Sequence, residues 1–133
     1  MTFRAVAVAT ACAALTAGAA VAHHSFSAEF DPERPVKLTG KVTEVKFSNP
    51  HAWIYMDVTG TDGQTVNWAL EMGGANALIR RGWRREDLPA GTVLLIEGWQ
   101  ARNATPTANI STVTFEDGRT LFAGSSNPAA PQQ

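Results

Sequence analysis

The chain has little cysteine, no strong excess of either charge, and no apolar segment suited to a permanent membrane span. Its single cysteine, Cys12, lies in the N-terminal apolar segment. The rest of the chain therefore has no disulfide and no thiolate ligand, so a metal site there must use nitrogen and oxygen ligands. The 11 basic and 12 acidic residues nearly cancel, which argues against a nucleic-acid-binding protein that acts through a basic surface.

The first 22 residues have the pattern of a secretory signal peptide. Arg4 gives a positive start, residues 5–21 are almost all small or apolar, and Ala20-Val21-Ala22 has the small-x-small form that signal peptidase accepts. The apolar segment contains many alanines rather than leucines, which makes it a poor membrane anchor. We therefore expect cleavage after Ala22, a periplasmic protein, and no stable membrane insertion after cleavage.

The hydrophobic pattern of the remaining chain predicts a single, mainly β domain. Apolar and polar residues alternate with the two-residue period of strands, over residues 36–42, 52–58 and 66–70. The alternation changes parity near Thr43 and Glu44, which predicts a bulge in the first strand. Further strands are expected over residues 92–100, 109–115 and 120–122.

The period changes between the third and fourth expected strands. Gly73-Gly74 interrupts the β pattern, and residues 75–81 fit a short helix that ends at Gly82. Three residues of this helix are spaced to face a core: Ala75, Leu78 and Ile79. Trp83 and Leu88 are expected to be further hydrophobic anchors.

The order of these elements predicts a small OB-fold-like barrel of five to six strands, with one short helix between strands 3 and 4. A β-sandwich with a helical insertion is the alternative. We divide the chain into a signal peptide (1–22), an N-terminal arm (23–35), the OB-like domain (36–123) and a disordered tail (124–133). Phe26 and Phe30 are expected to hold the arm against the domain. We expect a monomer or a weak dimer.

All three histidines lie either at the cleavage site or directly after the Asn49-Pro50 turn: His23, His24 and His51. Cleavage after Ala22 gives His23 a free α-amine beside its imidazole, and Cu(II) prefers such nitrogen ligands in a square or tetragonal plane. With the His51 ring as the third ligand, this set is a histidine brace. His24 offers a second mode, through the amine, the intervening amide and its own ring. The sequence therefore predicts a copper site.

Two alternatives to a copper site remain open. Zinc would combine the histidines with Asp31 or Glu71 in a tetrahedral set. In a metal-free protein, His23 and His24 are a solvated end, and His51 caps a turn or stacks beside Trp53.

Trp53 and Tyr55 form the candidate ligand-binding surface, because they alternate with the apolar Ile54 and Met56 and share a face with His51. OB-folds use aromatic side chains at such positions to hold bases or sugars. The other tryptophans are expected in the core. Four arginines after the helix are expected to form a solvated face: Arg80, Arg81, Arg84 and Arg85. No motif for a catalytic nucleophile or a phosphate-binding loop is present.

Several motifs occur in a characteristic order: His23-His24-Ser25, Phe30-Asp31, Asn49-Pro50-His51, Trp68 with Glu71, and Arg80 to Trp83. Together they resemble a family of small exported bacterial proteins that is catalogued as a domain of unknown function. The resemblance extends from His23 to about Leu121. It implies a periplasmic OB-like domain of Gram-negative type, with no activity to transfer.

We therefore expect an exported copper-binding protein that serves copper handling or envelope stress, and a binding role more than an enzymatic one. One alternative is a metal-free OB-type module that binds a peptide, a glycan or a partner protein. The other is an oxidase that uses the histidine brace. A periplasmic protein is the expected class of partner.

Overall fold

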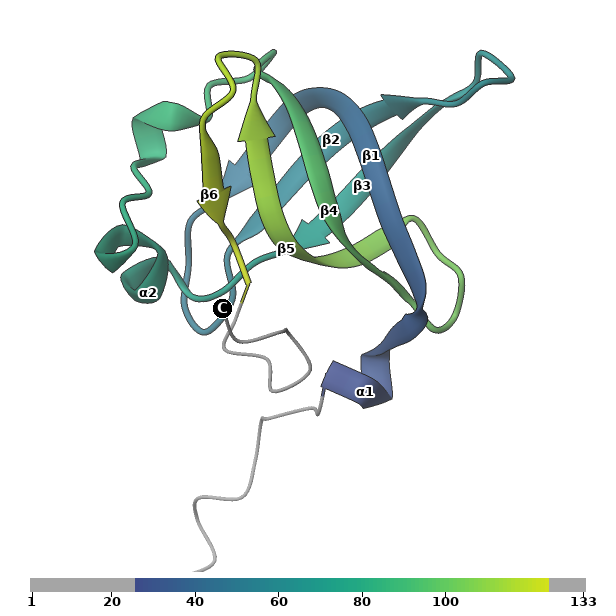
Figure 1. Ribbon diagram of the computed structural model, residues 1–133, viewed down its shortest axis with the longest axis horizontal. Helices are drawn as coiled ribbons and strands as arrows, with labels where there is room; N and C mark the ends of the chain where they lie inside the picture. Colours follow the sequence, from purple (N-terminus) through teal and green to yellow (C-terminus); the bar gives the residue numbers. More distant parts are fainter. Residues whose placement is uncertain (1–25, 125–133) are drawn as a thin grey trace, which may run out of the picture.

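The computed structural model describes residues 26–124, which form six strands and short helical segments (Figure 1). The strands are β1 (Phe30–Lys46), β2 (Trp53–Thr59), β3 (Thr65–Glu71), β4 (Val93–Ala101), β5 (Thr107–Phe115) and β6 (Thr120–Phe122). Helix α1 (Phe26–Glu29) precedes β1, while helix α2 (Ala75–Arg80) and the 3-10 helix η1 (Arg85–Asp87) connect β3 to β4. The mainly β class and the helix between the third and fourth strands are confirmed. Within residues 26–124, no helix has the length and apolar character needed to cross a membrane.

The six strands form one sheet in the order β3-β2-β1-β4-β5-β6, and each neighbouring pair in this order is antiparallel. β3 also pairs with β5 in parallel, through Ala69 with Thr107, Leu70 with Ala108 and Glu71 with Asn109. This additional pairing closes the sheet on itself. It places the last residue of β3 beside the start of β5, although the two segments are far apart in the sequence.

β1 is long because it pairs with two different strands. Residues 30–41 lie against β4, and residues 41–46 lie against β2. Gly40 lies where β1 passes from one partner to the other, and a Cβ atom at this position would collide with the backbone carbonyl of Asp57. A register shift between Val42 and Glu44 confirms the predicted bulge.

β1 begins at Phe30, earlier than the expected start at Val36, because Phe30 pairs with Ala101 of β4. The ring of Phe26 lies 5.6 Å from that of Phe30 and 5.5 Å from that of Trp99, measured between ring centres. The predicted role of the two phenylalanines is confirmed, since they hold the start of the described chain against the sheet.

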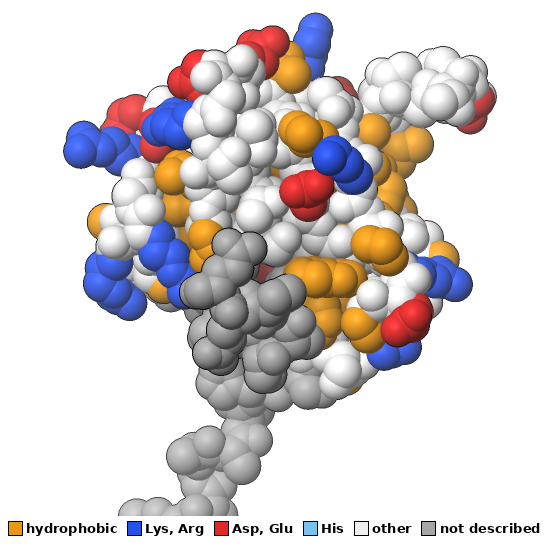
Figure 2. Space-filling model, in the orientation of Figure 1, with side chains coloured by type: hydrophobic (Ala, Val, Ile, Leu, Met, Phe, Trp, Pro, Cys, Tyr) orange, Lys and Arg blue, Asp and Glu red, His pale blue; other side chains and the backbone are white. Residues whose placement is uncertain are grey.

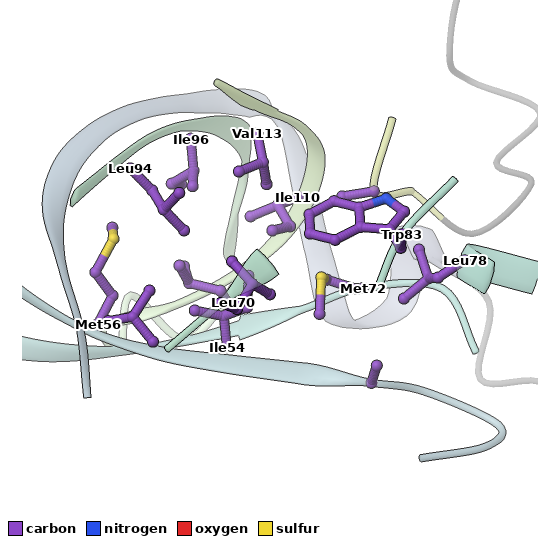
Figure 3. Close-up of a cluster of buried hydrophobic side chains, with 14 of the residues drawn as sticks. Ile54, Met56, Leu70, Met72, Leu78, Trp83, Leu94, Ile96, Ile110 and Val113 are labelled. Carbon is purple, nitrogen blue, oxygen red and sulfur yellow. The ribbon is translucent and has the colours of Figure 1, made fainter. Parts of the chain in front are cut away.

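The core fills the inside of the closed sheet (Figure 3). Ile54 and Met56 of β2 are fully buried, as the alternation predicts, and they face residues from β3, β4 and β5. Trp83 is 1% exposed and lies near Met72 and Leu78 at the α2 end of the core. The predicted anchor roles of Trp83 and Leu88 are therefore confirmed.

The prediction that Ile79 faces the core is wrong, because its exposed fraction is 57%. Ala75 and Leu78 are buried and lie three residues apart on one side of α2, which is only six residues long. Ile79 lies next around the helix and is left on the solvent side.

The four arginines near α2 are exposed, as expected, and Figure 2 shows basic side chains gathered on the left over this region. Arg81 also has a structural role. Its Nη1 donates a hydrogen bond to the carbonyl of Gly124 at 2.6 Å, and its guanidinium lies 4.9 Å from the ring centre of Phe122.

Replacing Trp83 with alanine should destabilise the protein strongly. The indole is buried, and its Nε1–H donates to the carbonyl of Phe122 at 2.8 Å. We expect Trp83→Ala to lower the free energy of unfolding by about 3–5 kcal/mol. Ile79→Ala, in the same region but exposed, should change it by less than about 0.5 kcal/mol. Chemical denaturation measures both, and equal effects of the two variants would contradict this assignment of the core.

Candidate functional site

His51 is held just before β2 by backbone contacts on both sides. Its carbonyl accepts a hydrogen bond from Ser48 Oγ at 2.7 Å. The next residue, Ala52, donates its N–H to the carbonyl of Gly73 at 3.1 Å and accepts from the N–H of Met72 at 2.8 Å. The backbone is therefore fixed at His51, and only the side-chain torsions remain to place the imidazole ring.

The imidazole of His51 faces the carboxyl group of Glu71. His51 Nδ1 lies 3.3 Å from Glu71 Oε1 and 3.4 Å from the carbonyl oxygen of Met72. Both partners are hydrogen-bond acceptors, so Nδ1 carries the proton and Nε2 keeps its lone pair in the neutral ring. The His51 side chain is 38% exposed, and within residues 26–124 no hydrogen-bond partner is found for Nε2. This nitrogen is therefore available to a ligand.

Glu71 belongs to a row of paired residues that crosses four strands. It pairs with Trp53 of β2 and with Asn109 of β5, and Asn109 pairs with Trp99 of β4. Paired residues project to the same face of a sheet. This row alternates with core residues such as Leu70, so it projects from the outer face.

The N-terminal segment lies against this outer face, where it packs on Trp99 through Phe26. The N–H of Arg102 donates to the carbonyl of Glu29 at 2.9 Å, and Arg102 Nε donates to the carbonyl of Ser27 at 2.7 Å. Glu71 is only 8% exposed although it points away from the core.

Burial dominates the electrostatics of Glu71. It raises the pKa of the carboxyl group above the usual value, because a charged group loses hydration there. The neighbouring His51 and a hydrogen bond from Asn109 Nδ2 to Oε1, at 3.1 Å, lower this pKa, while the charge of Glu29 raises it further. Burial prevails, and the pKa stays raised.

A pocket of about 370 Å³ opens beside Glu71. It is bounded by the ends of β3 and β4, the starts of β1, β2 and β5, and α1. Among its lining residues are Glu29, Trp53, Glu71, Arg102, Asn103 and Thr107. Figure 2 shows a group of hydrophobic side chains on this side of the molecule, directly above the position of α1. The arm and the His51–Glu71 pair thus meet at one place.

The site residues predicted from the sequence lie in different surroundings, and two of them are not described. His23 and His24 lie outside the described residues. Trp53 is half-buried and lines the pocket, whereas the ring of Tyr55 packs under Lys46, with Nζ 4.8 Å from the ring centre. The two aromatic residues therefore have different surroundings.

Of the two carboxylates considered as zinc ligands, Glu71 is the one in contact with His51. Asp31 instead pairs with Arg34 at 3.7 Å and with Arg102 at 3.8 Å. Within residues 26–124, no group of three or more histidine, cysteine, aspartate or glutamate side chains is placed to hold a metal ion.

Sequence reasoning missed Asn109 and Glu29, and it gave Glu71 little weight. The available signal was a polar residue between two apolar ones, Ala108 and Ile110, in an expected strand. That signal does not identify Glu71 as the partner of Asn109, because the contact between these two side chains depends on the parallel pairing of β3 with β5.

Glu71→Gln should change how stability depends on pH. Because the folded-state pKa of Glu71 lies above 4.5, the folded protein binds a proton there more readily than the unfolded chain. This contribution to stability is present below the unfolded pKa and is lost as pH rises through the folded one. Relative to Glu71→Gln, the wild type should therefore lose stability as pH rises from about 4.5 towards neutrality.

Chemical denaturation across this pH range measures the difference. Glu97→Gln is the control, because the pKa of Glu97 is lowered, chiefly by its hydrogen bond with Lys37, and the opposite sign applies. A pH-independent difference between the wild type and Glu71→Gln would contradict the burial of a charge at this position.

Comparison with known proteins gives a family but no activity. A search of curated proteins and a search of solved structures found no match. The model of the Family of unknown function (DUF6152) matches residues 10–109, which is more than half of the chain. This confirms the resemblance to a domain of unknown function, and the chain belongs to that family.

Proposed function

We propose that this is an exported, periplasmic copper-binding protein, in which His51 and the α-amine and imidazole of His23 hold one Cu(II) ion, with His24 assisting or substituting. The proposal places the protein in copper handling or envelope stress. One observation carries it: Nδ1 of His51 lies against Glu71 Oε1 and the carbonyl oxygen of Met72, which leaves Nε2 available at the surface.

In many metal sites, a carboxylate accepts a hydrogen bond from the ring nitrogen of a histidine that does not bind the metal. The carboxylate accepts the proton of one ring nitrogen, fixes the tautomer and makes the other nitrogen a stronger ligand. In this protein Nδ1 of His51 lies 3.3 Å from Glu71 Oε1, and Asn109 donates a hydrogen bond to the same carboxylate. The packing role considered for His51 gives no reason to direct a buried carboxylate at its ring, so the geometry favours a ligand role.

The course of the arm supports a contribution from His23. Ser27 and Glu29 are tied to Arg102, and Glu29 lines the same pocket as Glu71. His23 precedes Ser27 by four residues, so it can reach at most about 14 Å from that anchor. The anchor would thus hold a cleaved N-terminus within that distance of Ser27, on the side of the pocket that Glu29 and Glu71 line.

We further propose that the closed sheet is an OB-type barrel. Its support is the connectivity: β1 pairs with both β2 and β4, and β3 pairs with β5 in parallel. Such a barrel has no free edge along the seam between β3 and β5, and it provides a rigid support for His51 and Glu71.

The ligand role of His51 can be tested by titrating the exported protein with Cu(II) in a calorimeter. Glu71→Gln should weaken Cu(II) binding by about 10- to 100-fold, because it removes the carboxylate next to Nδ1 of His51. His51→Ala should weaken binding at least as much, since it removes a ligand. Glu97→Gln, an exposed glutamate on β4, should leave the affinity unchanged. Wild-type affinity in His51→Ala would rule out the proposal.

The contribution of His23 depends on the free N-terminus. N-terminal sequencing of the exported protein should begin at His23, and one alanine inserted before His23 should abolish the brace while the unfolding curve stays the same. His24→Ala in the same series separates the two binding modes.

A copper carrier should bind Cu(II) without consuming oxygen in the presence of ascorbate. Unchanged affinity in the extended variant would exclude the brace.

A further inference from the structure

The outer edge of β3 is unpaired over the first half of the strand. β3 pairs with β2 from Thr65 to Glu71, but it pairs with β5 only from Ala69 onwards. Residues 65–68 therefore have a strand on one side and, within residues 26–124, none on the other. In Figure 1, the loop end of the β2–β3 hairpin projects beyond the other strands. This short free edge can accept a further strand.

The backbone groups that face outwards at this edge belong to Thr65 and Asn67. Residues of an antiparallel strand bond alternately to the neighbour on one side and to the neighbour on the other. The N–H of Ala69 faces outwards, because it donates to the carbonyl of Pro106 at 3.0 Å. Steps of two residues from Ala69 lead back to Asn67 and Thr65. The carbonyl of Gln64 belongs to the other set, since it accepts a hydrogen bond at 2.8 Å within the hairpin.

The side chains at this edge do not protect it from strand addition. Residues 65–68 include no charged residue and no proline, and the strand keeps one register with β2. By contrast, the part of β1 that pairs with β4 contains Pro32 and Pro35, and proline on an edge opposes the addition of a strand. Val66 lies at the middle of the free edge and is 43% exposed.

We propose that this edge pairs with the same edge of a second copy of the chain, in an antiparallel two-fold dimer. With Thr65 opposite Asn67 of the second copy, the outward N–H and C=O groups of the two residues bond to each other. The two copies of Val66 then face each other on the two-fold axis, at a position where paired side chains approach closely. The dimer thus covers the exposed apolar side chain of the edge.

The length of the edge makes this dimer a weak one. The pairing ends before Ala69, where β5 occupies the same side of β3. Three residues from each copy form the seam, which is far smaller than a stable protein interface. A second copy suits the edge because its outward groups complement themselves and Val66 meets an identical side chain. The inference does not rest on the proposed function, since it uses neither His51 nor a metal ion.

Sedimentation equilibrium of the exported protein tests the proposal, with a metal chelator present to exclude association through copper. The wild type should shift reversibly from monomer to dimer as its concentration rises towards about 1 mM, the range of a weak association. Val66→Lys should stay monomeric, because it places like charges opposite each other on the axis. Ile79→Lys is the control: it makes the same change at an exposed residue of α2 and should dimerise like the wild type.

Cysteine cross-linking tests the register of the pairing. In a Cys12→Ser background, Val66→Cys places two thiols at opposed positions, where a Cα separation of about 4.5 Å permits a disulfide. Mild oxidation should therefore link the dimer. Gln64→Cys should link little, because the proposed pairing separates the two copies of residue 64 by about 13 Å along the strands.

Four results would each overturn the proposal. They are a wild type that stays monomeric over this concentration range, a Val66→Lys variant that still dimerises, loss of the dimer in both lysine variants, and equal cross-linking at residues 64 and 66. The first result includes the case in which the edge accepts a strand from a different protein. Unchanged unfolding curves of the two lysine variants establish that the fold is intact in both.

Discussion

The contact between His51, Glu71 and Asn109 is the constraint on which the rest of the site depends. A carboxylate in a nearly buried position is tolerated because an imidazole and an amide share one of its oxygens. Its burial is not a property of the core, since Glu71 projects from the outer face of the sheet. The N-terminal segment packs on that same face through Phe26 and is tied to Arg102.

The closed sheet explains how three residues from distant parts of the chain meet. β3 ends at Glu71 and lies in parallel beside β5, which brings Asn109 next to it. His51 precedes β2, whose first residue pairs with Glu71. One strand end therefore places the imidazole on one side of the carboxylate and the amide on the other. Glu71 also lines the pocket at this end of the sheet.

The sequence predicted the elements of the fold well where a face is strongly apolar. Alternation located β2 closely, and the change of parity located the bulge near Glu44. The helical spacing of apolar residues wrongly predicted that Ile79 is buried, because a short helix against one end of a sheet buries only a narrow stripe. The sequence pattern also predicted a start of β1 that is too late. Prolines interrupt the strand pattern in that segment, and its strand conformation depends on pairing with β4.

The sequence alone determined that the domain is mainly β, that a metal site in it would have to use nitrogen or oxygen ligands, and that histidine occurs at only three positions. These follow from composition and from local periodicity. Tertiary structure decided which carboxylate lies beside His51, which nitrogen of the ring is left available, and that a pocket lies at the same place. The contact with His51 depends on the pairing of β2 with β3, and the pocket depends also on the pairing of β3 with β5; no local pattern records which strands meet when a sheet closes.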